Sequence, residues 1–405
     1  MGLVHELQKR YPPIILLLAL LSAFPPLATD MYLPALPLLQ REWQVSLVTA
    51  NLTLVVFFLT YCAFLLVYGP LSDRYGRRPP LVVGVSLFIV ACLVCGLADS
   101  AAMMIFGRFL QGAGAAASSA IVFAISKDLF TGPQRQRVFI HIGVIVATAP
   151  MIAPIIGGWI VTLVSWRWIF LLQALLGSVA LVGVVRMDES LRPAGEPPNI
   201  GQVAASYLRL LANYRYILVL LTVSIPCVPA FAFIGGSADL YITRLGFSEQ
   251  VYGYFFGFNA LAFVLAPLAF SRAVRRVPLF RLMPLALFGM LASALLLVCP
   301  LLPMPWRLTL PMFTLTFCYA FCRPAGNNLI LEQVDRDTGA ASSLMVFGHF
   351  MIGSTAMAVF SLDWPDKLTT LAVMGVAAVA VSLALWTVVR RWIVPAAADG
   401  ETAEV

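Results

Sequence analysis

Long stretches without a charged side chain are the feature that most constrains this sequence. An α-helix needs roughly 20 apolar residues to cross about 30 Å of hydrocarbon. Eleven charge-free stretches are near or above that length, namely 11–29, 43–72, 79–98, 109–126, 138–166, 168–185, 216–238, 250–271, 282–306, 338–362 and 368–389. A twelfth, 308–331, is equally apolar but contains Arg323. Strands of a membrane barrel would alternate polar and apolar residues, which these stretches do not. The pattern predicts an all-α membrane protein with twelve transmembrane helices.

Composition excludes a soluble protein. Of the 405 residues, 61% are hydrophobic and only 11% are charged, against about 25% charged residues in soluble domains. The seven cysteines lie in the apolar stretches, where a free thiol packs as a small hydrophobe. The Cys92-x-x-Cys95 spacing has no second Cys or His pair beside it. We therefore expect no metal and no cofactor.

The basic residues indicate how the chain is oriented. If the amino terminus is cytoplasmic, 19 Lys and Arg residues fall on the cytoplasmic side and five on the outer side, with Arg108 and Arg323 inside the membrane. Positive charge marks the cytoplasmic side, so we expect both termini there. The net charge of +7 then indicates contact with the lipid bilayer and requires no nucleic-acid partner.

A polar stretch after the sixth apolar segment divides the chain. Residues 186–215 contain three prolines, which is typical of a linker. We expect a six-helix bundle at 1–188, a cytoplasmic linker at 189–213, a second six-helix bundle at 214–394 and a cytoplasmic tail at 395–405. Two such bundles are typical of secondary transporters, whose substrate site lies between the halves. No G-x-x-x-x-G-K-[ST] loop is present, so we expect neither ATP-driven transport nor an enzyme.

The loop after the second apolar stretch carries a patterned set of glycines and charges. It reads GPLSDRYGRRP and resembles the G-x-L-a-D-r-x-G-r-[KR] signature of the major facilitator superfamily. The resemblance implies that superfamily's fold, two pseudo-symmetric six-helix bundles. We interpret the loop as a cytoplasmic latch, in which the glycine at its start allows close helix approach and the aspartate pairs with basic groups. The latch residues are Gly69, Asp73, Arg74, Gly76, Arg77 and Arg78.

The fourth apolar stretch begins after an arginine at membrane depth. The segment RFLQGAGAA, with Arg108, Gln111 and Gly112, is similar to the superfamily motif R-x-x-Q-G-x-[GA]-x-[GA]. A buried arginine costs about 2.5–3.5 kcal/mol even on lenient insertion scales, so it needs a partner. The small residues after it permit close helix packing.

The fifth stretch resembles the motif associated with export branches of the superfamily. It contains Pro150, Pro154, Gly157 and Gly158, with Ala153 in place of the usual glycine before the second proline. The prolines kink the helix, and the glycines permit a tight contact. The direction of transport follows from the resemblance alone.

The first stretch points to a particular branch. Residues 28–37 read ATDMYLPALP, which is close to the opening helix of the bicyclomycin/chloramphenicol resistance (Bcr/CflA) drug:proton antiporters. The segments SWRWIF at 165–170 and RPAGNN at 323–328 support this similarity. The resemblance implies a multidrug efflux antiporter of a bacterial inner membrane that exchanges small organic molecules for protons.

Helix geometry places Asp30 and Arg108 at similar depths. At about 1.5 Å per residue, Asp30 lies roughly 26 Å along a helix that begins near Pro13, and Arg108 about 10 Å from the outer end of the fourth span. Asp30 is also the one carboxylate well inside an apolar span. Burial and a nearby cation act on a carboxyl in opposite senses, so we predict that these two residues couple transport to protons. A polar cap near a helix end is the alternative for Asp30.

Other candidates rest on weaker patterns. His141 and His349 fall on symmetry-related spans and can either relay protons or hydrogen-bond between helices. We expect Asp239, at the outer end of the seventh span, to be solvated. The candidates for lining a substrate cavity are Tyr32, Phe57, Tyr61, Tyr254, Tyr319 and His349.

We thus expect a monomeric antiporter whose partners are a small organic substrate, protons and the bilayer. One alternative is a proton-coupled exporter of one endogenous metabolite, such as an amino acid or a sugar. Another is a membrane sensor that transports nothing.

Overall fold

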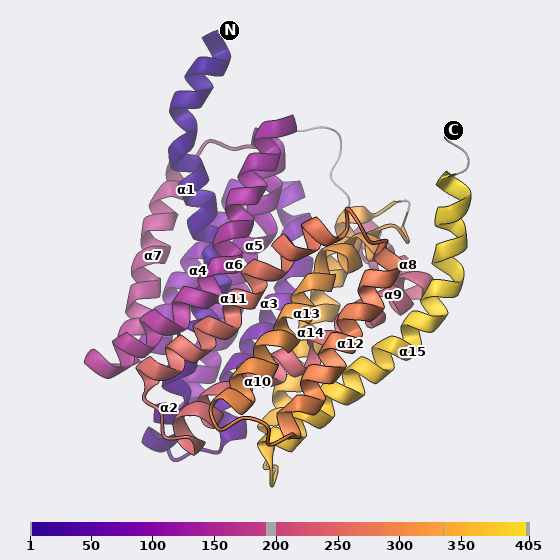
Figure 1. The fold of residues 1–405 in the computed structure, drawn as a ribbon. Coiled ribbons are helices and arrows are strands. Elements are labelled where there is room, and N and C mark those ends of the chain that lie inside the picture. The colour runs from indigo at the N-terminus through magenta and orange to yellow at the C-terminus, as the bar shows by residue number, and fades with distance from the viewer. Residues whose placement is uncertain (1, 192–199, 335, 402–405) are drawn as a thin grey trace. The chain divides into compact units, whose positions relative to one another are not determined.

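The computed structural model describes residues 2–191, 200–334 and 336–401, and within these ranges the chain forms helices and connecting turns with no strand (Figure 1). Eleven segments of this described chain are long and apolar enough to cross a membrane. Helix α13 (Trp306–Leu331) is not among the eleven, but its 26 residues are also long enough. The predicted all-α membrane fold is confirmed.

The helices group into two compact units, residues 1–200 with 246–257, and residues 201–245 with 258–405. The first unit, drawn mainly in indigo and magenta in Figure 1, contains the following helices: α1 (Gly2–Asp30), the 3₁₀ turn η1 (Leu33–Ala35), α2 (Leu36–Glu42), α3 (Leu47–Tyr75), α4 (Arg78–Gly96), α5 (Ala101–Leu129), α6 (Gly132–Leu163) and α7 (Arg167–Arg186). The start of α11 (Glu249–Ala273) also packs with this unit.

The second unit follows in pink, orange and yellow. It contains α8 (Ile200–Ala212), α9 (Tyr214–Ser224), the turn η2 (Ile225–Cys227), α10 (Val228–Ala238), the π-helical turn η3 (Asp239–Arg244), the rest of α11, α12 (Leu279–Val298), α13, α14 (Thr338–Ser361) and α15 (Lys367–Glu401). Helix α8 occupies much of the predicted linker, whose residues 192–199 lie outside the described chain. The predicted tail from 395 is helical as far as Glu401. The predicted domain boundaries remain predictions.

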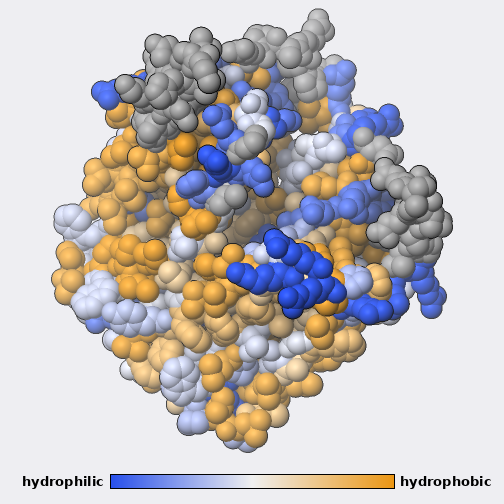
Figure 2. Space-filling view, turned by 45° about the horizontal axis from the view of Figure 1, so that its top comes forward, coloured by the Kyte–Doolittle hydropathy of each residue, from blue (hydrophilic) through white to orange (hydrophobic). Residues whose placement is uncertain are grey.

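The surface carries many large apolar side chains, as a lipid-facing surface requires. Val83, Leu175, Leu285 and Leu295 are each at least half exposed. Figure 2 shows broad hydrophobic areas in orange beside clusters of hydrophilic residues in blue.

The first membrane span is broken in its second half. Helix α1 stops at Asp30, and the chain passes through η1 before α2 begins. Pro34 has no N–H with which to bond the Asp30 carbonyl four residues earlier, and Pro37 cannot bond Leu33. This break leaves the last carbonyls of α1 in need of other donors.

Candidate functional site

Asp30 lies at the break in the first span and is almost fully buried. Its side chain is 7% exposed. Thr29 donates a hydrogen bond to its Oδ1 over 3.0 Å, although the same hydroxyl also lies 3.1 Å from the Pro25 carbonyl. Among the described residues no basic group forms an ion pair with Asp30. A buried carboxyl without a counter-charge pays a large desolvation cost when it ionises.

Arg108 is fully buried and donates a hydrogen bond to a backbone carbonyl at the end of α1. Its Nη1 donates to the Ala28 carbonyl over 2.7 Å, and its Nε donates to the Thr53 carbonyl of α3 over 3.3 Å. The guanidinium lies against the rings of Tyr32 and Phe57, with its central carbon 4.8 and 4.6 Å from their centroids. A cation is favoured at a helix C-terminus, where unpaired carbonyls carry partial negative charge. Arg108 therefore acts as a cap of α1.

The predicted pairing of Asp30 with Arg108 is absent from this conformation. The two residues do lie at neighbouring levels, since Arg108 contacts Ala28, two residues before Asp30. Depth arithmetic on two separate helices could not show that α1 ends there and offers its own carbonyls to the guanidinium. One nitrogen of Arg108, Nη2, has no hydrogen-bond partner among the described residues.

A glutamine pair extends the network across the unit. Gln111 accepts from Arg108 over 2.5 Å and donates to Gln173 of α7 over 2.8 Å. Gln173 in turn donates to the Leu27 carbonyl over 3.0 Å. Arg108 and Gln173 thus hold successive carbonyls in the last turn of α1. Gln173 was not among the predicted residues, although it is the lone glutamine in the charge-free stretch 168–185.

Gly157 of α6 makes a backbone contact with the break. A Cβ at this position would lie 2.1 Å from the carbonyl oxygen of Met31, and one at Gly112 of α5 would lie 2.4 Å from that of Phe57. A Cβ at Gly158 would lie 2.4 Å from the Glu249 carbonyl at the start of α11. Pro150 and Pro154 lie inside α6. The glycines predicted to give tight contacts at 112, 157 and 158 do so.

The loop between α3 and α4 forms a network of ions around Arg77. This side chain bonds Asp73 Oδ1 over 2.5 Å, Ser72 Oγ over 2.8 Å and Asp128 Oδ2 of α5 over 2.8 Å. Burial opposes the charge of Arg77, but the bonds to Asp128 and Asp73 hold its pKa above the ordinary value. The loop motif predicts that Asp73 lies beside basic groups, whereas Asp128 of α5 was not predicted.

The carboxylate of Glu189 also binds the loop between α3 and α4. Its carboxylate accepts the backbone N–H of Arg77 over 2.8 Å and that of Arg78 over 3.0 Å. Gly76 turns the backbone toward it with φ of +91°, and a Cβ there would lie 2.6 Å from Glu189 Oε2. Partial burial raises the pKa of Glu189, but the backbone N–H bonds from Leu191, Arg77, Arg78 and Ser190 outweigh this and hold it below its usual value.

The remaining latch residues differ in their surroundings. The Arg78 guanidinium donates to the Val185 carbonyl of α7. Arg74 lies over the ring of Tyr75, 5.5 Å from its centroid. A Cβ at Gly69 would meet nothing within 4 Å, so the predicted close helix approach at Gly69 is not observed. Within this loop, Gly76 is the position at which a Cβ would clash with a neighbouring side chain.

The predicted aromatic candidates are divided between the two units. Tyr32, Phe57 and Tyr61 are buried in the first unit, where Phe57 stacks on Tyr61 and Tyr32 bonds the Thr53 hydroxyl over 3.0 Å. Tyr254 is half exposed and accepts a bond from Trp159.

In the second unit, Tyr319 and His349 are buried and joined by a 2.6 Å hydrogen bond. The other histidine, His141, is exposed and bonds the Arg137 carbonyl of its own helix.

Asp239 corrects the expectation of a solvated carboxylate. Its residue is 8% exposed, and Arg244 donates to its Oδ2 over 3.0 Å across the π-helical turn η3. The wider π turn brings residues five apart together, which hydropathy alone does not show. No group of three or more His, Cys, Asp or Glu side chains within the described ranges could hold a metal ion.

Long apolar helices in two units, with buried polar networks between the helices of the first, define a polytopic helical membrane protein. The family model described as "Major Facilitator Superfamily" matches residues 18–358. The chain belongs to the major facilitator superfamily. It is therefore a multi-pass membrane protein and a secondary transporter of small solutes, not an enzyme.

Several bacterial proteins are similar to the chain, two of them over almost their whole length. The chain is 29% identical to "Uncharacterized MFS-type transporter YdgK" of Bacillus subtilis, over 93% of this chain and 95% of that protein. It is 28% identical to "Bicyclomycin resistance protein homolog" of Haemophilus influenzae, over 95% and 98%. It is 29% identical to "Multidrug resistance protein MdtL" of Escherichia coli, over 56% and 58%.

Solved structures share the fold at low identity. A D-xylose–proton symporter superposes with a TM-score of 0.70 at 15% identity, covering 92% of this chain and 97% of that one. An inward-facing, unoccupied bacterial homologue of the human lysosomal transporter Spinster gives 0.69 at 13%, covering 94% and 98%.

Proposed function

We propose that this transporter exports drugs or similar small organic molecules from a bacterium in exchange for protons, as a member of the Bcr/CflA branch. The observation that carries the proposal is the buried Asp30 at the break in the first span. A carboxyl without a counter-charge can take up a proton and can release it when a substrate competes for the same place. The similarity to a bicyclomycin resistance homologue and to MdtL supports the drug-export assignment.

In this proposal Asp30 is the proton-coupling residue and Arg108 is a positioning residue. Arg108 fixes the Ala28 carbonyl, and Gln173 fixes the Leu27 carbonyl, so the turn that carries Asp30 has a defined position. Tyr32 and Phe57, which flank the guanidinium, form the apolar surroundings of this turn. The orientation is the one that the basic residues predict, with both termini in the cytoplasm and the protein in the cytoplasmic membrane.

The energetics of exchange are adequate for export. One proton that moves down about 100 mV supplies roughly 2.3 kcal/mol. Because a tenfold concentration ratio corresponds to about 1.4 kcal/mol, one proton supports a gradient of about fifty-fold.

The test is flux in proteoliposomes under an imposed pH gradient. Bicyclomycin and chloramphenicol are compared with a set of amino acids and sugars, with and without a protonophore. Accumulation of the drugs that collapses with the protonophore is the expected result. Accumulation of a single amino acid or sugar identifies a metabolite exporter instead, and no flux of any compound contradicts the transport role.

The matched variants are Asp30→Asn and Asp99→Asn. Asp99 is an exposed aspartate between α4 and α5, so it controls for the loss of one carboxylate. We expect Asp30→Asn to lose proton-driven accumulation and Asp99→Asn to retain it.

A further inference from the structure

Helix α8 has an apolar surface that the rest of the second unit covers only in part. Tyr207 and Leu210 pack with an apolar cluster that α9, α12, α13, α14 and α15 also form. The spacing of Ala204, Leu208 and Leu211 places these three residues on one adjoining stripe of the helix. Leu208 is 67% exposed and Leu211 is 54% exposed. The apolar surface of α8 is therefore wider than the part that the protein buries.

The polar side of α8 binds the loop between α13 and α14. Ser206 donates to Asp337 Oδ1 over 3.0 Å, and Arg209 Nη2 donates to Asp337 Oδ2 over 2.8 Å. These bonds fix the rotation of α8 about its own axis. Leu208 and Leu211 each follow one of these donors by two positions, which is about 200° around a helix. The exposed leucines therefore face away from this loop.

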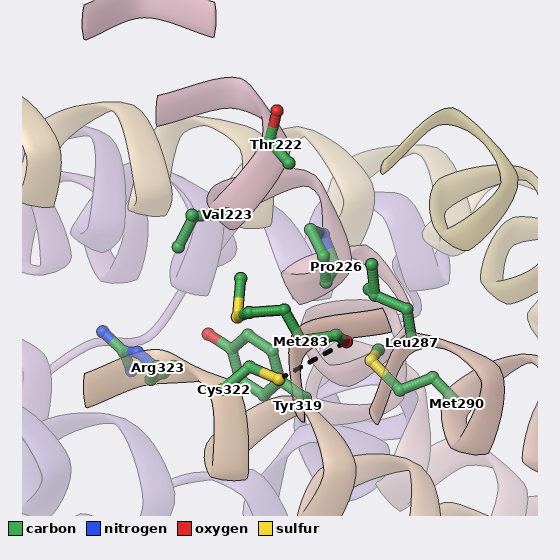
Figure 3. Close-up of a pocket in the computed structure, with 9 residues that line it drawn as sticks. All are labelled: Thr222, Val223, Pro226, Met283, Leu287, Met290, Tyr319, Cys322 and Arg323. Carbon is green, nitrogen blue, oxygen red and sulfur yellow. Dashed lines mark hydrogen bonds between the residues drawn. The ribbon is translucent and has the colours of Figure 1, made fainter. Parts of the chain in front are cut away.

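The level of α8 is that of the ends of the membrane spans. The helix ends at Ala212, and the candidate span Tyr214–Arg244 begins two residues later. Asn213, between them, donates to the Gln333 carbonyl over 3.1 Å, just after the end of α13. The cavity that separates α9 from α12 and α13 has a volume of only about 20 Å³ (Figure 3), the size of one water molecule. Close packing of α9 thus holds α8 where the chain enters the bilayer.

Exposed arginines lie around this helix. Arg215, Arg281 and Arg390 each adjoin in sequence a residue that belongs to, or packs against, the apolar cluster of α8. Arg391 follows, and an exposed acid in the same region is Glu332 at the end of α13. Positive charge is therefore in excess here. In the orientation proposed above this end of the unit is cytoplasmic, where anionic lipids give the membrane surface a negative potential.

We propose that α8 is an interfacial helix, with Leu208 and Leu211 among the lipid acyl chains and the surrounding arginines on the phosphates of anionic phospholipids. Amphipathic helices of this kind lie in the plane of the interface with their apolar side about 5–10 Å deep. Tyr214, which is 61% exposed, fits the same level, because tyrosine is enriched at membrane interfaces. The partner is one leaflet of the bilayer, and the inference does not depend on the substrate or on export.

The test measures the depth of single positions of α8 in nanodiscs that contain the full-length protein. Leu208→Cys and Gln202→Cys, the latter four residues before Ser206 on the polar side, are labelled with a nitroxide. The signal of the wild type treated in the same way is subtracted, because native cysteines are present. Collisions with oxygen report acyl chains, and collisions with a soluble nickel chelate report water. We expect the ratio of oxygen to nickel collisions to be several-fold higher at position 208 than at 202.

Leu211→Cys repeats the measurement for the case in which the first variant does not fold. Ratios at 208 and 211 as low as that at 202 would overturn the inference, since the leucines would then lie in water. Low collision rates with both reagents would also overturn it, because a protein, such as a second copy of this chain, would then cover the stripe.

The charge of the lipid tests the role of the arginines. The label at 208 is measured in phosphatidylcholine alone and in phosphatidylcholine mixed with phosphatidylglycerol. We expect a higher ratio in the anionic mixture, and we expect the rise to disappear when glutamine replaces Arg215, Arg281 and Arg390 together. The control replaces three exposed arginines at the end of α11 and just after it, Arg272, Arg275 and Arg276, and should retain the rise. No rise in the wild type, or an equal rise in the first triple variant, would overturn the assignment to anionic phospholipids.

Discussion

The guanidinium of Arg108 donates a 2.7 Å hydrogen bond to the carbonyl of Ala28, and the helix that contains Ala28 ends two residues later at Asp30. The arginine at membrane depth therefore neutralises the end of a helix and leaves the nearby acid without an ion pair.

Removal of the Arg108 side chain should destabilise the first unit. Arg108→Gln leaves the Ala28 and Thr53 carbonyls without their donor, and each unsatisfied buried group costs about 1–3 kcal/mol. We expect a lower melting temperature in detergent and loss of proton-driven export. Arg272→Gln is the exposed control, and equal melting temperatures for Arg108→Gln and the wild type would argue against the cap.

Gly157→Ala should abolish export without preventing insertion. The added Cβ would lie 2.1 Å from the Met31 carbonyl oxygen, so α6 must move away from the break beside Asp30, and Gly157→Leu would require a larger movement. Gly143→Ala on the same helix is the control, because a Cβ there meets nothing within 4 Å. Normal flux in a well-expressed Gly157→Ala variant would contradict the contact.

Disruption of the loop around Arg77 should slow the conformational cycle of the transporter and leave its affinity for substrate nearly unchanged. Asp73→Asn, Arg77→Ala and Asp128→Asn each remove part of one ion network. We expect slower flux with nearly unchanged dissociation constants. Arg74→Ala, which removes only a contact with a neighbouring ring, should leave both values unchanged. A parallel loss of binding would contradict the latch role.

The hydrogen bonds that the Glu189 carboxylate accepts from the backbone N–H groups of Arg77 and Arg78 should weaken in acid. Because the pKa of Glu189 in the folded protein is held below its usual value, its stabilising effect is present above the ordinary carboxyl value of about 4.3. That effect is lost as pH falls through the lowered pKa. Glu189→Gln should lower stability at neutral pH by about 1 kcal/mol, since the carboxylate is partly exposed. The same substitution should also make the melting temperature depend less on pH between 6 and 3. An unchanged slope would show that the Glu189 carboxylate does not stabilise the loop between α3 and α4.

The helices were predictable because hydrocarbon requires long uncharged segments, and almost every span contains one. The glycines at 112, 157 and 158 were predictable from motif spacing, since close backbone contacts exclude side chains. The partners of Arg108 and Arg77 were not predictable, because they include backbone carbonyls and acids more than 50 residues away, such as Asp128.

Two errors have a shared cause. Hydropathy did not show that the first span breaks after Asp30 or that the seventh ends in a π turn that buries Asp239. Irregular backbone changes which groups meet, and hydropathy does not report it.

The most direct test of the account is proton release when substrate binds. Purified wild type, Asp30→Asn and Asp99→Asn are titrated between pH 5 and 9 with the substrate that the flux panel identifies, in weak buffer with a pH indicator. We expect proton release from the wild type and from Asp99→Asn, and none from Asp30→Asn. Equal release from Asp30→Asn and the wild type would contradict it and place the coupling residue elsewhere.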